Sequence, residues 1–101
     1  MNKIEIIARR ILGWKLNRWD RWYDFENNKF IYDSEFQPEH NLEHAMLIVK
    51  RLEMMGYTYK ADGHTGVYFN DHYAIGETLA QAITNAAYLI ADNSSIPDEW
   101  L

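Results

Sequence analysis

The chain has 101 residues and a mass of 12.0 kDa, which is room for one compact domain. Apolar residues make up 48% of it and charged residues 25%, so the composition excludes a disordered chain, and no apolar run approaches the ~20 residues of a membrane-spanning helix. The lack of cysteine excludes disulfides and thiolate metal sites, and the net charge of −5 argues against general binding to DNA or RNA.

The predicted elements begin with a helix near the N-terminus. Its apolar stripe has helical spacing and consists of Ile4, Ile7, Ala8, Ile11 and Leu12. Gly13 is a suitable stop after it, because glycine commonly adopts the left-handed conformation just beyond a helix. Arg9 and Arg10 interrupt this short apolar stretch, which is not the layout of a signal peptide, so we expect a cytoplasmic protein.

Two further helices are predicted later in the chain. The second begins after Pro38 with Asn41 as its N-cap, and it ends at Gly56. The third begins at Thr78, which together with Gln81 matches a capping box. Its apolar face is rich in alanine, and small side chains permit close approach to a sheet or to another helix.

The segments between the helices alternate in the manner of β-strands. We expect strands over residues 21–25 and 29–33 in the first segment, and over 57–60, 66–69 and, after a short turn, 72–75 in the second. Short links imply antiparallel hairpins, so the fold class is α+β in the order α-β-β-α-β-β-α, without an internal repeat. The domain is expected to span residues 1–93. A tail over 94–101 then ends in Trp100-Leu101, which could cover its own domain or a neighbouring subunit.

Charge is distributed unevenly along the chain. Residues 1–23 hold six basic and two acidic residues, a net of +4, whereas residues 24–101 hold four basic and thirteen acidic, a net of −9. Three of the four tryptophans lie in the basic part. Arginine and lysine can hold phosphate oxygens, and an aromatic face can stack on a base, so this segment predicts a site for a nucleotide or another anionic aromatic ligand. Its candidate residues are Lys15, Arg18, Trp19, Arg21, Trp22 and Tyr23.

The competing interpretation is that the tryptophans and Tyr23 belong to the core and that the cations balance acidic neighbours. Spacing alone does not decide between the two. In the second β region, Tyr57 and Tyr59 share one strand face. One face of that region should pack on helices, and the other could form a ligand platform or a subunit interface.

Histidines offer two weaker signals for chemistry. Residues 40–44 match the H-x-x-E-H pattern of a zinc site, but Pro38 and the Asn41 cap place His40 before the helix, so we reject this interpretation and expect no metal and no cofactor. His64 and His72 lie at predicted turns beside aspartates, where acid–base work is conceivable but no nucleophile accompanies them. We therefore expect no catalytic residues.

Several segments in order resemble one known family. They are the Ile4–Trp14 helix ending in Leu-Gly-Trp, the Trp19-x-x-Trp22-Tyr23 strand entry, the helix end over residues 51–57, and residues 76–83 leading into Ala86-Ala87. This pattern resembles the phage ABA sandwich domain family, small proteins of phages and prophages in Gram-positive bacteria, over roughly residues 4–92. The resemblance implies an α/β/α sandwich, which with the strands above means an antiparallel sheet of about four strands packed against three helices. These motifs specify a fold rather than a chemistry, so no catalytic residue is carried over.

A phage setting favours a protein that binds something the host makes. Our leading hypothesis is a non-catalytic, homo-oligomeric sponge in the host cytoplasm that captures a nucleotide-derived immune signal, a cyclic dinucleotide or an ADP-ribose derivative. The alternative is a protein–protein interaction module whose acidic bulk inhibits a host protein, with acids such as Glu35, Glu39 and Glu43 at its surface. An enzyme that cleaves such a signal, using His64 or His72, is a third hypothesis.

Overall fold

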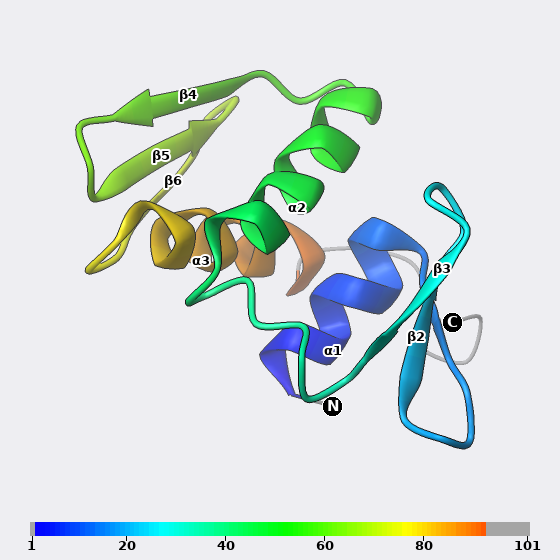
Figure 1. The fold of residues 1–101 in the computed structure, drawn as a ribbon. Helices are drawn as coiled ribbons and strands as arrows, with labels where there is room; N and C mark the ends of the chain where they lie inside the picture. Colours follow the sequence, from blue (N-terminus) through cyan, green and yellow to red (C-terminus); the bar gives the residue numbers. More distant parts are fainter. Residues whose placement is uncertain (1, 93–101) are drawn as a thin grey trace.

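The computed structural model describes residues 2–92, in the order helix, three strands, helix, three strands, helix (Figure 1). The elements are α1 (Lys3–Ile7), its π-helical continuation η1 (Ala8–Leu12), β1 (Lys15–Leu16), β2 (Arg21–Asp24), β3 (Lys29–Tyr32), α2 (Leu42–Met54), β4 (Tyr59–Asp62), β5 (Gly66–Phe69), β6 (His72–Ile75) and α3 (Leu79–Asp92). The predicted tail over residues 94–101, with Trp100 and Leu101, lies outside the described residues.

Side-chain caps mark the start of each long helical segment. The Asn41 side-chain oxygen accepts the backbone N–H of His44 at 3.2 Å, as predicted for the N-cap of α2. Thr78 Oγ1 accepts the N–H of Gln81 at 3.1 Å before α3. In the predicted capping box the Gln81 side chain should accept the N–H of Thr78. In the structure Gln81 Oε1 accepts the N–H of the preceding residue, Glu77, instead.

Glycines with positive φ end the first two helical segments. Gly13 has φ 73° after η1, and Gly56 has φ 101° shortly after α2. Both lie in the left-handed region that a side chain disfavours, and there the chain leaves the helix toward the next strand. The predicted first helix is confirmed in extent, but its second half is a wider π-helical turn in which the Gly13 N–H donates to the Ala8 carbonyl.

Two separate three-stranded sheets form, and each is an antiparallel meander. Sheet A has the order β1-β2-β3 and sheet B the order β4-β5-β6. The α+β class and the antiparallel pairing are confirmed, whereas the expected single sheet of about four strands between helices is wrong. Figure 1 places the two sheets on opposite sides of the helices, so the strands of one never meet those of the other. The two-residue strand β1, too short for an alternation pattern, was not predicted.

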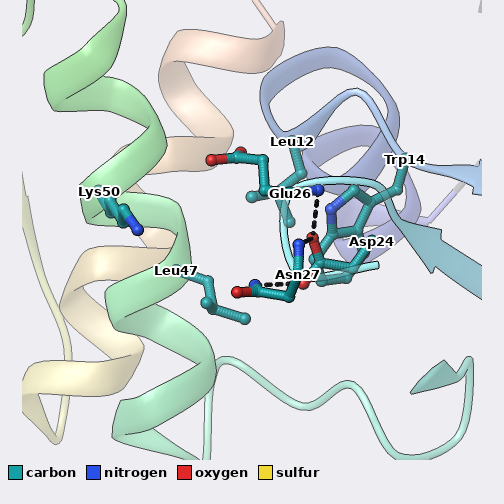
Figure 2. A pocket seen from close by; sticks show the side chains of 7 residues that line it. All are labelled: Leu12, Trp14, Asp24, Glu26, Asn27, Leu47 and Lys50. Atoms are coloured by element: carbon teal, nitrogen blue, oxygen red, sulfur yellow. Dashed lines mark hydrogen bonds between the residues drawn. The ribbon is translucent and has the colours of Figure 1, made fainter. Parts of the chain in front are cut away.

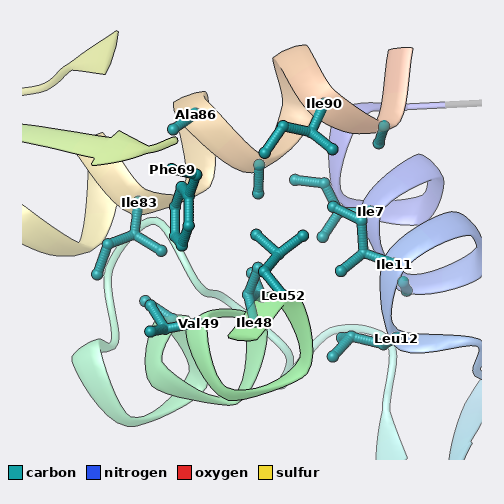
Figure 3. Packing of buried hydrophobic residues seen from close by; sticks show 14 of the residues in the cluster. Ile7, Ile11, Leu12, Ile48, Val49, Leu52, Phe69, Ile83, Ala86 and Ile90 are labelled. Atoms are coloured by element: carbon teal, nitrogen blue, oxygen red, sulfur yellow. The ribbon is translucent and has the colours of Figure 1, made fainter. Parts of the chain in front are cut away.

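The core fills the space between the helices and the inner faces of the sheets (Figure 3). Helix α3 packs against α1, α2, β5 and β6, and its buried face carries the small side chains Ala82, Ala86 and Ala87. These alanines let the neighbouring elements approach closely, as their sequence pattern indicated. Phe69 of sheet B and Leu52 of α2 are fully buried in the same cluster.

Candidate functional site

Sheet A presents one face to the core and leaves the other open. Along β2, Trp22 and Asp24 are buried, while Arg21 and Tyr23 alternate with them and point the opposite way. The strand register places Tyr23 between Lys15 of β1 and Phe30 of β3 and pairs Arg21 with Tyr32. We call the resulting surface the outer face of sheet A, and its five side chains are Lys15, Arg21, Tyr23, Phe30 and Tyr32.

A cation and a phenol contact each other at one end of this face. The Arg21 guanidinium lies over the Tyr32 ring, 4.8 Å from its centroid, and Arg21 Nη2 donates to the Tyr32 hydroxyl at 3.0 Å. The Arg21 Nε has no hydrogen-bond partner within residues 2–92. The arginine is therefore held in place against one ring, and its Nε–H is buried rather than open to an added acceptor.

Two aromatic rings lie side by side at the other end. Tyr23 and Phe30 have centroids 5.1 Å apart and planes tilted by 46°. The Tyr23 hydroxyl donates to the Asn28 side-chain oxygen at 2.8 Å, which orients its ring. Phe30 is 56% exposed although it is large and apolar, so this part of the face offers a ring surface to solvent that nothing within the described residues covers.

The turn between β1 and β2 adds a third cation and an exposed indole. The Arg18 guanidinium lies 4.5 Å from the Trp19 ring centroid, and Trp19 is 60% exposed. The Asn17 side-chain oxygen accepts the N–H groups of Trp19 and Arg21, at 2.9 and 3.1 Å. The backbone of this turn is thus ordered by a local polar contact rather than by burial of the tryptophan.

Five of the six predicted site residues lie in this region, and one does not. Lys15, Arg21 and Tyr23 lie on the outer face of sheet A, with Arg18 and Trp19 on the adjoining turn. Trp22 lies on the inner face, fully buried, with its indole N–H donating to Asp33 Oδ1 at 2.9 Å and Arg9 5.2 Å from its ring centroid. Because it has no exposed surface, Trp22 supports the sheet from below and offers no stacking surface to a ligand.

Phe30 and Tyr32 complete the outer face, and neither was among the predicted site residues. The signal was available, because residues 29–32 lie on the predicted strand beside Tyr23, where the period of two places Phe30 and Tyr32 on one face. What the sequence does not give is the register across the hairpin, which decides that this face is the one shared with Arg21 and Tyr23.

A small hollow lies beside sheet A, and the buried carboxylate that lines it is already hydrogen-bonded. Figure 2 shows this hollow between η1, α2 and the β2–β3 turn, with a volume of about 60 Å³, enough for a few water molecules. Buried Asp24 accepts the N–H groups of Glu26 and Asn27, both at 3.2 Å, and the Asn27 amide at 2.7 Å. Asp24 therefore closes the hairpin turn, and the hollow is too small for a nucleotide.

Two of the four histidines, His44 and His72, pack against aromatic rings. His44 Nδ1 accepts the backbone N–H of Gln37 at 3.1 Å, and its ring packs 5.5 Å from Phe36, centroid to centroid. Burial lowers the pKa of His44 below its usual 6.5. His72 lies 6.2 Å from the Tyr57 ring, centroid to centroid. Across residues 2–92, no three histidine, aspartate or glutamate side chains gather in a way that could hold a metal ion.

A family model, the phage ABA sandwich domain, matches residues 5–88. The match spans most of the 101 residues, so the chain belongs to this family. No curated protein and no solved structure matches the chain. Among the described residues no helix is both long and apolar enough to span a membrane.

Proposed function

We propose that this phage ABA sandwich domain protein binds a nucleotide-derived immune signal, a cyclic dinucleotide or an ADP-ribose derivative, and withholds it without chemical change. The binding surface is the outer face of sheet A together with Arg18 and Trp19. Sequestration of this kind would counteract host anti-phage defence. It requires affinity and a high copy number or an oligomer, and no reaction chemistry.

The observation that carries the proposal is the grouping of cations and open aromatic rings on one rigid surface. Tyr23, Phe30 and Trp19 offer ring faces on which a base can stack, an interaction worth about 1–3 kcal/mol per base. Arg21 and Lys15 stand beside these rings and can hold phosphate oxygens through charge-assisted hydrogen bonds. A β-sheet fixes the spacing between rings and cations, so little order would be lost on binding.

Native mass spectrometry provides the first test. The purified protein is measured alone and then with a pool of cyclic di-AMP, cyclic GMP–AMP and ADP-ribose. We expect a discrete oligomer that gains the mass of one pool member, and the ligand should be recovered unchanged after denaturation. Recovery of an altered ligand would refute the non-catalytic part of the proposal, and the absence of any adduct would refute the choice of ligand class.

Matched variants then locate the site. Arg21→Ala should weaken binding about tenfold, because it removes one charge-assisted contact, whereas Lys50→Ala on α2 changes the net charge equally and should leave affinity unchanged. Trp19→Ala should also weaken binding about tenfold through lost stacking. Met54→Ala is its control, since Met54 is equally exposed at 60% on another surface. Equal effects of Arg21→Ala and Lys50→Ala would point to diffuse electrostatics instead of a site.

One observation favours the alternative, an acidic surface that inhibits a host protein. Glu35 and Glu43 are exposed, both act electrostatically on His44, and neither forms an ion pair with another residue of the range 2–92. Charge reversal of this pair should abolish pull-down of a basic host protein and leave small-molecule binding intact. If Glu35→Lys with Glu43→Lys abolishes the protection that the protein gives the phage, and Arg21→Ala does not, inhibition of a host protein is the function and ligand sequestration is refuted.

A further inference from the structure

The two halves of the chain repeat one structural unit, although their sequences show no repeat. Each unit is a helical segment, a glycine in the left-handed conformation and an antiparallel meander of three strands. Gly13 followed by Trp14 leads into sheet A, and Gly56 followed by Tyr57 leads into sheet B. Strand β5 then takes the place of β2, and the registers of the two sheets can be compared position by position.

The registers place the same three kinds of side chain in one row on each outer face. In sheet A the row runs from Lys15 through Tyr23 to Phe30. In sheet B the paired residues at the equivalent positions run from Lys60 through Tyr68 to Tyr73. A lysine on the first strand thus stands beside a tyrosine on the central strand and a second ring on the third.

The ring geometry of the two rows also agrees. The centroids of Tyr68 and Tyr73 are 4.6 Å apart with planes tilted by 39°, close to the 5.1 Å and 46° of Tyr23 and Phe30. Tyr68 and Tyr73 are 37% and 42% exposed. The inner face of sheet B packs into the core, where Val67 and Phe69 are fully buried. In both sheets the outer row therefore lies on the side away from the core.

We infer that the outer face of sheet B is a second site for the same class of ligand, an anion with a planar ring, so that each chain takes up two ligand molecules. This inference rests on the proposed function of sheet A. The kind of ligand is inferred from the residues that line this face. A hollow of about 270 Å³ is lined by one cation, one aromatic ring and two further polar side chains, which are Lys60, Tyr68, Thr58 and Asn70. That volume is close to the lower end of small-molecule sites, about 300 Å³, and suits one nucleotide moiety.

Three polar groups surround the Tyr68 ring in this hollow. The Lys60 side chain has no ion pair and no hydrogen bond within residues 2–92, so its ammonium group is available to an anion. The Asn70 side-chain oxygen accepts the Thr58 N–H at 2.9 Å, which leaves the amide NH₂ without a partner among the described residues. The ammonium, the amide and the Thr58 hydroxyl are the donors that phosphate oxygens require.

Sheet B should bind more weakly than sheet A. Gly66 and Ile75 occupy the positions that Arg21 and Tyr32 hold in sheet A, so one cation is missing. In addition the Tyr73 hydroxyl donates to Asp62 at 3.4 Å, which brings a carboxylate to the edge of the face. Burial and Asp62 raise the pKa of Tyr73 above its usual 10, so the hydroxyl is a hydrogen-bond donor over the whole physiological pH range, as an ordinary tyrosine is. We expect an affinity about tenfold or more below that of sheet A.

Isothermal titration calorimetry with cyclic di-AMP, cyclic GMP–AMP and ADP-ribose, each titrated separately, tests the inference. For the probe that binds, the wild type should take up two molecules per chain with unequal affinities. The double variant Lys60→Ala/Tyr68→Leu should take up one molecule with the affinity of sheet A. The pair Arg21→Ala/Tyr23→Leu should keep the weaker event, and Lys50→Ala should keep both. Circular dichroism melting confirms that each variant is folded.

The outcomes separate the two proposals. One molecule per chain in the wild type, lost in the sheet A variant and unchanged in the sheet B variant, would overturn the second site and leave the proposed function standing. No binding of any probe would overturn both. Two equal events that survive the sheet B variant would also overturn the inference, because the second molecule would then bind elsewhere.

Discussion

Trp22→Phe offers a quantitative test of the assignment of this tryptophan to the core. The change removes about 40 Å³ of fully buried side chain, and at about 24 cal/mol per Å³ the cavity costs about 1 kcal/mol. Loss of the transfer free energy of the removed ring atoms costs about 1 kcal/mol more. The hydrogen bond from the indole N–H to Asp33 is also lost, about 1 kcal/mol, and exposed Asp33 is left solvated, so it carries no further penalty.

The expected loss in the free energy of unfolding is therefore about 3 kcal/mol, or about 12–24 °C in melting temperature for a domain of this size. Urea denaturation followed by far-ultraviolet circular dichroism measures it without relying on tryptophan emission. Trp19→Phe is the control, since Trp19 is 60% exposed and should change stability by less than about 0.5 kcal/mol. A cost below 1 kcal/mol for Trp22→Phe, or lost ligand binding in the folded variant, would refute the reasoning.

Two further predictions concern stability alone. Burial lowers the pKa of His44 in the folded state, so its contribution to stability is complete above pH 6.5 and is lost as the pH falls through that lowered pKa. His44→Gln should therefore reduce the pH dependence of the urea midpoint between pH 7.5 and 5. An unchanged pH dependence in this variant would contradict the prediction. Gly76→Ala should lower the free energy of unfolding by about 2–3 kcal/mol, because its Cβ would lie 2.6 Å from the Ala82 backbone nitrogen. Gly63→Ala, strained only by φ 70°, should lower it by about 1 kcal/mol. Thermal melts that give the reverse order would contradict the close packing of α3.

Local sequence determined the elements of this fold. Helical periodicity, the Asn41 cap and the two glycines with positive φ act over a few residues, and the helices begin and end near where these signals lie. The strands 66–69 and 72–75 follow from alternation and a short turn in the same way. These features depend on backbone geometry and on neighbours within about one turn of the chain, so they can be inferred without knowing what packs where.

Only the tertiary structure decided which strands pair and which face of each is buried. The helices lie between the two meanders (Figure 1), so the strands form two sheets instead of the one expected. Trp19 is exposed and Trp22 is buried, and this difference depends on which side of β2 faces η1. Residue type alone does not indicate that side. The outer face of sheet A likewise exists only because the register brings Phe30 and Tyr32 beside Arg21 and Tyr23. Hydrophobicity alone would have assigned the two aromatic residues of β3 to the core.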